Sequence, residues 1–435
     1  MKREPSIAPQ SCLCLMITLG LCFGLIIPEQ GAGQDFKTFF EQGRVLAQQG
    51  RYSEAITAFS KALDLNPKFA PAFTWRGFAK RRNGDDDGAL ADVTRALELD
   101  LNDAFAYFNR GVLKERRRNL DGALADYEKA IELNPSLGAA YSTRGFIKFL
   151  RGDVNGALSD IMRAVELDPK NDYALCNRGI VREKQGDISG ALADYNQALA
   201  LNPSSNFRAY VARGLLKSKQ KDLTGALADL NKGVEIDPKN SFGYINRANV
   251  KKEMGDLTGA IADLDQAVGL DPVNRLAYTN RGYLKLLQKN YSAALQDTDR
   301  AIALDPGSSM AYKNRALINK EKGNLGAALT DFNQALDLDP RNRSAYLGRG
   351  ELMENRGDLA GALADYQRAL DLDPGNGETA RQVEELKTKM ATAAQPQPGT
   401  PKAGSKKPAP APKPKARRVD QPDQLEIPLP LFGPR

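Results

Sequence analysis

The chain has 435 residues with a formal net charge of +7, and it contains no histidine. Histidine is the commonest general base and the commonest metal ligand, so its absence argues against most acid–base and metal-dependent enzymes. The positive charge is concentrated in residues 391–435, which hold eight Lys and Arg against three Asp and Glu. The rest of the chain is nearly neutral and does not indicate a nucleic-acid platform, so we expect nucleic acid not to be a partner.

The first 33 residues have the order of a secretory signal peptide. Lys2 and Arg3 precede an uninterrupted apolar run of 16 residues, 12–27, which is short for a membrane span. Small residues at 31–33 then predict cleavage before Gln34. We expect export to the periplasm or cell envelope. An uncleaved membrane anchor remains the alternative.

Residues 36–376 form ten copies of a 34-residue unit, with one interval of 35. The clearest marker is the proline that closes each copy, here called position 32, which Leu101 replaces in the second copy. The prolines are Pro67, Pro135, Pro169, Pro203, Pro238, Pro272, Pro306, Pro340 and Pro374.

Each copy predicts two amphipathic helices of about 12 to 14 residues joined by a tight turn, because its apolar and small residues recur at helical spacing. Position 15 is Gly in seven copies, which favours the left-handed conformation that ends a helix. Position 16 is Asp or Asn in nine copies and is expected to cap the second helix.

This pattern resembles the tetratricopeptide repeat, with a small residue at position 8, Ala at 20 and 27, an aromatic or aliphatic residue at 24 and Pro at 32. The resemblance implies an all-α fold, an α-solenoid in a right-handed superhelix of ten helix-turn-helix repeats. We identify the chain as a member of this family of the exported bacterial type.

Position 7 departs from the family pattern, since it is Arg in nine copies where an apolar residue is usual, and position 23 is Asp in the same nine. An unpaired guanidinium at a half-buried position is costly, so we predict a structural ladder of Arg–Asp pairs between the two helices. The alternative is a row of arginines presented to an acidic partner. The central rungs are Arg110 with Asp126, Arg144 with Asp160, Arg178 with Asp194, and Arg213 with Asp229.

Residues 377–390 carry apolar side chains at helical spacing and predict a helix that caps the last repeat. Residues 391–435 contain 11 of the 24 prolines and predict an extended, disordered tail. Its apolar end, residues 425–432, is a candidate docking motif.

In the tetratricopeptide family the first helices line a concave groove with positions 2, 5, 9, 12 and 13. These positions are markedly apolar here, and we expect them to bind a partner and to contribute little to the repeat core. The alternative is that these residues pack on neighbouring first helices. Neighbouring bases, such as Arg81 and Arg116, suggest an acidic ligand. The predicted groove residues are Phe105, Phe108, Val112, Phe146, Phe149, Leu150, Tyr173, Ile180, Leu215, Phe242, Ile245, Tyr283 and Leu286.

No catalytic constellation, cofactor motif or metal-ligand spacing stands out in the sequence. The favoured function is a non-enzymatic scaffold that binds peptide or helical segments of another protein in the groove. The alternative is a cell-envelope tether whose basic, Pro-rich tail binds an anionic polymer or a membrane surface.

Overall fold

The computed structural model describes residues 35–394, so the predicted signal segment and most of the predicted tail lie outside the described residues. Within this range the chain forms 21 helices and no strands. Twenty of them alternate between 13 and 14 residues, one pair for each repeat. The fold is therefore an all-α solenoid of helix-turn-helix repeats.

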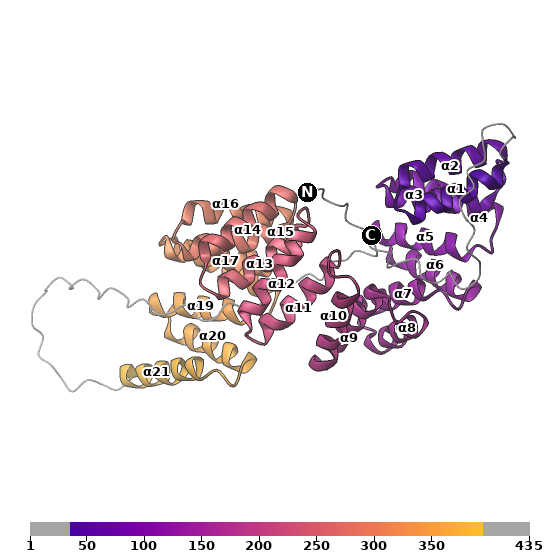
Figure 1. The fold of residues 1–435 in the computed structure, drawn as a ribbon. Helices are drawn as coiled ribbons and strands as arrows, with labels where there is room; N and C mark the ends of the chain where they lie inside the picture. The colour runs from indigo at the N-terminus through magenta and orange to yellow at the C-terminus, as the bar shows by residue number, and fades with distance from the viewer. Residues whose placement is uncertain (1–34, 395–435) are drawn as a thin grey trace, which may run out of the picture. The chain divides into compact units, whose positions relative to one another are not determined.

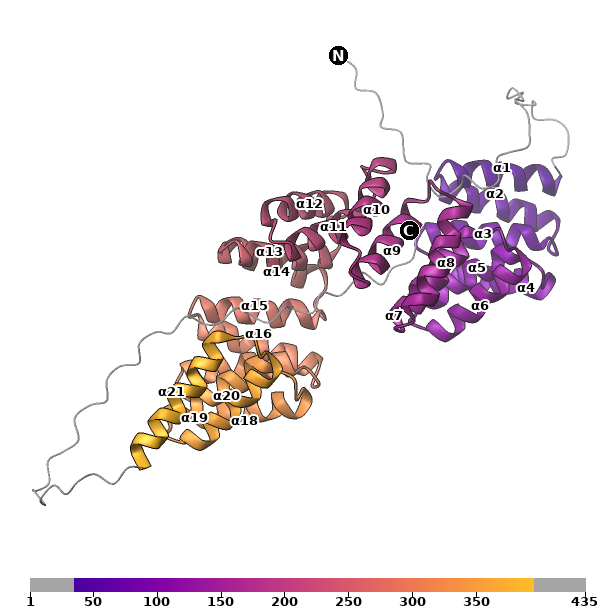
Figure 2. The same cartoon turned by 90° about the horizontal axis from the view of Figure 1, so that it is seen from below.

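The described helices divide into two compact units. Figures 1 and 2 show successive hairpins stacked side by side within each unit. The first unit contains α1 (Phe36–Gln48), α2 (Tyr52–Leu65), α3 (Ala70–Arg82), α4 (Asp86–Leu99), α5 (Ala104–Arg116), α6 (Leu120–Leu133), α7 (Gly138–Leu150), α8 (Val154–Leu167), α9 (Asp172–Lys184), α10 (Ile188–Leu201), α11 (Phe207–Lys219) and α12 (Leu223–Ile236).

The second unit holds the last four repeats and one further helix. It contains α13 (Ser241–Glu253), α14 (Leu257–Leu270), α15 (Arg275–Leu287), α16 (Tyr291–Leu304), α17 (Ser309–Glu321), α18 (Leu325–Leu338), α19 (Arg343–Asn355), α20 (Leu359–Leu372) and α21 (Gly377–Ala394). Helix α21 continues four residues past Met390, because Ala-Thr-Ala-Ala offers mostly good helix-forming residues. Val383 and Leu386 of α21 are buried in one cluster with Tyr366 of α20.

The turns between paired helices follow from positions 15 and 16. Seven glycines at position 15 have positive φ, between 76° and 92°. In the other three repeats Arg118, Lys221 and Lys289 take φ of 60° to 67° at the same position. The following Asp or Asn caps the next helix in eight repeats, and in one of them Asp187 Oδ1 accepts from the Gly190 amide at 2.9 Å. Asn324 makes no such hydrogen bond.

Small residues at position 8 allow the paired helices to pack closely. A Cβ built on Gly111 would lie 2.6 Å from the ring of Tyr127, and one on Gly179 would lie 2.5 Å from the ring of Tyr195. Tyr127 and Tyr195 are fully buried at position 24. The glycine therefore makes room for the aromatic ring that fills the centre of the repeat.

Candidate binding face

The first helices of neighbouring repeats contact one another in both units, as α3 does with α5 and α15 with α17. Positions 5, 9 and 12 therefore face another helix. The prediction that the groove residues lie outside the core is wrong for eight side chains, which are buried: Phe108, Val112, Phe146, Ile180, Leu215, Ile245, Tyr283 and Leu286. A first helix buries a wider apolar stripe than a hairpin alone requires, because it packs against its own second helix and against neighbouring first helices.

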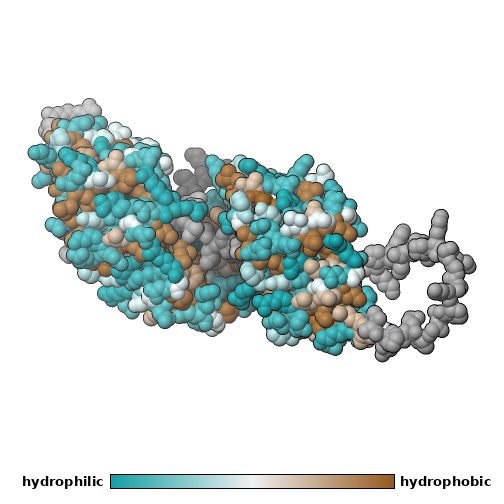
Figure 3. Space-filling model, turned by 180° about the vertical axis from the view of Figure 1, so that it is seen from behind, coloured by the Kyte–Doolittle hydropathy of each residue, from teal (hydrophilic) through white to brown (hydrophobic). Residues whose placement is uncertain are grey.

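The remaining predicted groove residues are half-buried: Phe105, Phe149, Leu150, Tyr173 and Phe242. They come mainly from position 2 and from the last turn of the first helix. Figure 3 shows hydrophobic residues in separate patches among hydrophilic ones on the face that it draws. The half-buried aromatic residues are thus the part of the predicted groove that retains accessible surface.

A connected group of aromatic rings lies on the first helices of the second and third repeats. Trp75 and Phe78 of α3 both contact Phe105 of α5, with ring centroids 5.3 Å and 5.7 Å apart. Phe105 stacks at 6.4 Å on Phe108. Trp75, Phe78 and Phe105 are half-buried, whereas Phe108 is buried. We call these four residues, together with Arg44 and Arg81, the aromatic face.

The two arginines lie over the aromatic rings. The Arg44 guanidinium carbon is 5.4 Å from the centre of the Trp75 ring, and that of Arg81 is 5.5 Å from Phe78. Burial and the nearby charges of Arg116 and Arg82 lower the pKa of Arg81 to about 10. Arg81 is only 4% exposed, whereas the Arg44 side chain is 31% exposed. Cation–π contact holds both side chains flat on the rings, and of the two Arg44 presents its charge at the surface.

Trp75, Phe78 and Arg44 belong to this face but were not predicted from the sequence. Phe78 and Arg44 occupy position 9 of their repeats, which the family pattern assigns to the groove. That pattern was therefore sufficient to find them. Trp75 stands at position 6, which the pattern did not assign, and only the packing of α3 against α5 reveals it.

The other bases predicted near the groove have carboxylate partners in several cases. Arg116 Nη1 lies 2.7 Å from Asp86, and Lys219 Nζ lies 2.7 Å from Glu183. In the second unit Lys320 Nζ lies 2.8 Å from Glu351. Such pairs reduce the positive potential around these bases.

Arg at position 7 and Asp at position 23 meet in all nine repeats that carry them. Each pair is bidentate, with Nη2 to Oδ1 distances of 2.6–2.8 Å and Nε to Oδ2 distances of 2.8–3.0 Å. The hydrogen bond that Arg110 donates to Asp126 raises the pKa of Arg110. Since these guanidinium groups are bound within their own repeat, the ladder positions do not form the binding face.

Two further groups belong to most of the nine rungs and were not predicted from the sequence. A base at position 11 contacts Oδ2 of the same Asp at 2.7–2.8 Å in seven repeats: Lys80, Lys114, Lys148, Arg182, Lys217, Lys251 and Lys285. An aromatic ring at position 4 lies under the arginine at 5.2–5.8 Å in eight repeats. The recurrence of Lys or Arg at position 11 in the sequence could have predicted the first of these two groups.

A second concentration of buried polar groups lies on α5, α9 and α11. Glu115 is buried and accepts a hydrogen bond from the Tyr127 hydroxyl at 2.8 Å. Burial raises the pKa of its carboxyl group. The Arg208 guanidinium carbon lies 4.2 Å from the centre of the Phe146 ring. Burial raises the pKa of the Cys176 thiol to about 12, which disfavours the reactive thiolate.

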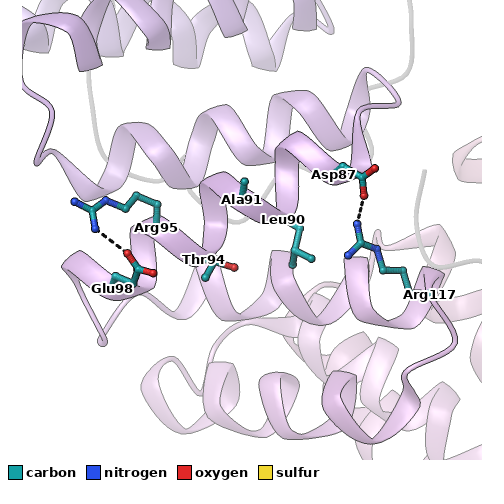
Figure 4. A pocket seen from close by; sticks show the side chains of 7 residues that line it. All are labelled: Asp87, Leu90, Ala91, Thr94, Arg95, Glu98 and Arg117. Atoms are coloured by element: carbon teal, nitrogen blue, oxygen red, sulfur yellow. Dashed lines mark hydrogen bonds and ion pairs between the residues drawn. The ribbon is translucent and has the colours of Figure 1, made fainter.

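Two depressions on the surface of the described residues are lined partly by charged side chains. Figure 4 shows the one along α4, where Arg117 reaches Asp87 and Arg95 Nη1 lies 2.7 Å from Glu98. The other, in the second unit, is lined by residues of α15, α17 and α19, where Arg275 Nε lies 2.8 Å from Asp305. The charged groups at both depressions thus include mutually neutralising pairs.

No helix in residues 35–394 is long and apolar enough to cross a membrane. Tetratricopeptide repeat models match the sequence at residues 104–137, 173–205, 207–240, 245–309 and 314–377, and a TPR repeat model matches residues 43–84. A search of curated proteins found no sequence match.

Solved structures similar to this chain include yeast Tom70 (18% identity, covering 83% of this chain and 91% of that chain, TM-score 0.44). Another is a tetratricopeptide repeat protein from Parabacteroides merdae (20% identity, covering 60% of this chain and 98% of that chain, TM-score 0.47). A third is the APC/C hetero-tetramer Cut9-Hcn1 (15% identity, covering 82% of this chain and 84% of that chain, TM-score 0.49). These TM-scores are below 0.5, so the assignment rests on the sequence models. Because those models together match more than half of the chain, the protein belongs to the tetratricopeptide repeat family.

Proposed function

We propose that this tetratricopeptide repeat protein is a non-enzymatic scaffold and that its aromatic face binds a protein segment with acidic and apolar side chains. The supporting observation is the group of half-buried rings, Trp75, Phe78 and Phe105, with Arg44 and Arg81 lying over it. Aromatic rings and arginines are the residue types that contribute most to binding energy at protein interfaces. Apolar side chains of a ligand pack on the rings, and its carboxylates contact the partly exposed Arg44 guanidinium group.

A peptide array tests this function with the full chain. The peptides carry apolar residues with either acidic, neutral or basic neighbours, and binding is compared with that of the Arg44→Glu variant. We expect acidic apolar peptides to bind, and the charge reversal to weaken binding at least about tenfold, the effect of 1.4 kcal/mol. Arg356→Glu is the matched control, because Arg356 is an exposed arginine in the second unit. Equal binding of acidic and basic peptides would contradict the proposal.

We also propose a second role, attachment to an anionic polymer or membrane surface through the tail. The excess of Lys and Arg over acidic residues in 391–435 supports it. Vesicles with and without anionic lipid test it: removal of residues 395–418, which contain seven Lys and Arg and no acid, should abolish binding to anionic vesicles. Binding that survives this removal would contradict the tether.

Export to the periplasm or cell envelope remains our proposal for the location of the protein. It is supported by the charged start, the apolar run and the small residues before Gln34. Amino-terminal sequencing of the exported protein tests it, with a start at Gln34 expected. An intact Met1 in membrane-bound protein would favour the anchor instead.

A further inference from the structure

The depression in the second unit is a pocket of about 480 Å³, within the range of roughly 300–1,000 Å³ that is typical of ligand sites. Among the ten repeats, position 1 is arginine only in the eighth and the tenth. The chain enters the helix between them, α17, through the small residues 307–309, which leave room between the neighbouring first helices. We call this depression the terminal pocket, and its lining includes Arg275, Leu276, Met310, Leu338, Arg341 and Arg343.

Part of the lining of the terminal pocket is apolar and accessible. Leu338 is 38% exposed, and Leu276 and Met310 are half-buried. Apolar surface continues along the chain just before α15, where Leu270 is 39% exposed and Val273 is 67% exposed. An apolar side chain that covers Leu338 removes apolar surface from water, which favours binding. Because the apolar surface extends along the loop, an extended peptide covers more of it than a small molecule does.

The two carboxylates of the terminal pocket are engaged by the protein itself. Asp305 pairs with Arg275 Nε at 2.8 Å and accepts from the Gly307 amide at 3.1 Å. Asp339 Oδ1 accepts from the Arg341 amide at 2.9 Å. Both carboxylates therefore hold the loops of the pocket.

The guanidinium groups of Arg341 and Arg343 are less fully engaged. The exposed Arg341 side chain forms no ion pair or hydrogen bond with another residue of the described range 35–394. Arg343 Nε lies 3.6 Å from Asp373, and its Nη2 lies 3.5 Å from Thr379 Oγ1. Both distances are longer than usual hydrogen bonds, so Arg343 is held loosely. A carboxylate that enters the pocket therefore finds a guanidinium group with free donors.

We propose that the terminal pocket is a second binding site, which takes a peptide segment with a carboxylate next to a leucine-sized apolar side chain. The apolar side chain contacts Leu276, Met310 and Leu338, and the carboxylate pairs with Arg341. The site lies wholly within the second unit, whereas the aromatic face belongs to the first unit. It therefore does not depend on the proposed function of the aromatic face.

Met310 lines the terminal pocket, so the NMR signal of its methyl group reports on this site. The full chain, labelled with ¹³C at its methionine methyl groups, is titrated with the peptide acetyl-Gly-Asp-Leu-Gly-amide, and Met310→Leu identifies the signal. We expect the Met310 signal to shift and to saturate. Arg341→Glu should raise the dissociation constant at least about fivefold. Arg300→Glu is the matched control, because Arg300 is an exposed arginine of α16 that does not line the pocket, and it should leave the titration unchanged.

Two altered peptides test the two parts of the ligand. One has asparagine in place of the aspartate, the other has glycine in place of the leucine, and each should bind at least about fivefold more weakly. A Met310 signal that does not shift, or equal binding of the asparagine peptide, would overturn the proposal. An equal shift with sodium acetate would also overturn it, since any small carboxylate would then be sufficient. If circular dichroism shows that Arg341→Glu loses helix, Arg341→Gln gives the same test without a reversed charge.

The same titration separates this inference from the proposed function. Arg44→Glu should leave the Met310 shift unchanged, because Arg44 lies on the aromatic face. If Arg44→Glu weakens binding to the peptide array while the Met310 signal never shifts, the aromatic face binds ligands and the terminal pocket does not. If the Met310 signal shifts while array binding is insensitive to Arg44→Glu, the terminal pocket is supported and the proposed role of the aromatic face is wrong.

Discussion

Arg178 and Asp194 are joined by two charge-assisted hydrogen bonds, with Nε 3.0 Å from Oδ2 and Nη2 2.6 Å from Oδ1. The Asp194 side chain is only 2% exposed and also accepts from Arg182 Nη1 at 2.8 Å. Similar contacts recur through both units. One buried carboxylate therefore links two bases of the first helix to the second helix of its repeat.

The first prediction concerns this pair. Arg178→Ala should lower the free energy of unfolding by about 1–3 kcal/mol, because it leaves a buried carboxylate with one partner fewer. Asp194→Ala should add little to that loss. A double-mutant cycle by urea denaturation of the full chain measures the coupling. Strictly additive losses of stability, with no coupling energy, would contradict the ladder. The control is Arg163→Ala, because Arg163 forms an exposed i,i+3 ion pair with Glu166.

The second prediction concerns the left-handed turn residues. Lys289 adopts φ of 61° at a position where seven repeats have glycine. Lys289→Gly should stabilise the protein by about 0.5–1 kcal/mol, because the strain of a side chain at positive φ exceeds the added entropy of glycine in the unfolded chain. The reverse change, Gly255→Lys, should destabilise it, since Gly255 has φ of 87°. Thermal melts should show a higher melting temperature for Lys289→Gly and a lower one for Gly255→Lys. Changes in the same direction would contradict this explanation.

The third prediction separates core from surface on α5. Phe108 is 6% exposed and contacts Tyr127 with ring centroids 5.9 Å apart. Phe108→Ala should therefore lower the free energy of unfolding by about 3–5 kcal/mol. Phe105→Ala should cost less, because Phe105 is half-buried, and it should weaken binding of acidic apolar peptides. If Phe108→Ala leaves the melting temperature unchanged, Phe108 belongs to the surface after all.

The fourth prediction is a pH dependence from Glu115. Burial raises the pKa of this carboxyl above its ordinary value of 4.5, whereas Arg208 and Arg116 and the Tyr127 hydroxyl oppose the shift. A raised pKa means that the charged form costs stability in the folded state. This cost is full at pH values above the folded pKa and disappears as the pH falls below 4.5.

Glu115→Gln removes the charge and keeps an acceptor for the Tyr127 hydroxyl. We expect the variant to be stabilised relative to the unmodified chain most at pH 7, and the difference to shrink towards pH 4.5 by at most about 1.4 kcal/mol per pH unit. Urea midpoints at several pH values measure it. A difference that is constant with pH would show that Glu115 does not titrate as described.

The sequence alone determined the repeat, the paired helices and the Arg–Asp partners within a repeat. These features depend on residues close along the chain, and they recur at a fixed period, so ten copies report the same arrangement. Arg178 and Asp194 are 16 residues apart, and they could be paired because Arg at position 7 and Asp at position 23 occur in the same nine repeats. The cap at Asp187 follows from local backbone geometry in the same way.

The tertiary structure alone decided which side of each first helix remains accessible. Phe105 and Phe108 lie about one helical turn apart, and the sequence predicts both as groove residues. In the structure Phe105 is half-buried and Phe108 is buried. Their burial depends on how closely neighbouring first helices approach, which is set by the packing of side chains from different repeats. Trp75 joins the aromatic face for the same reason, since its contact with Phe105 joins residues 30 positions apart and forms only when α3 packs against α5.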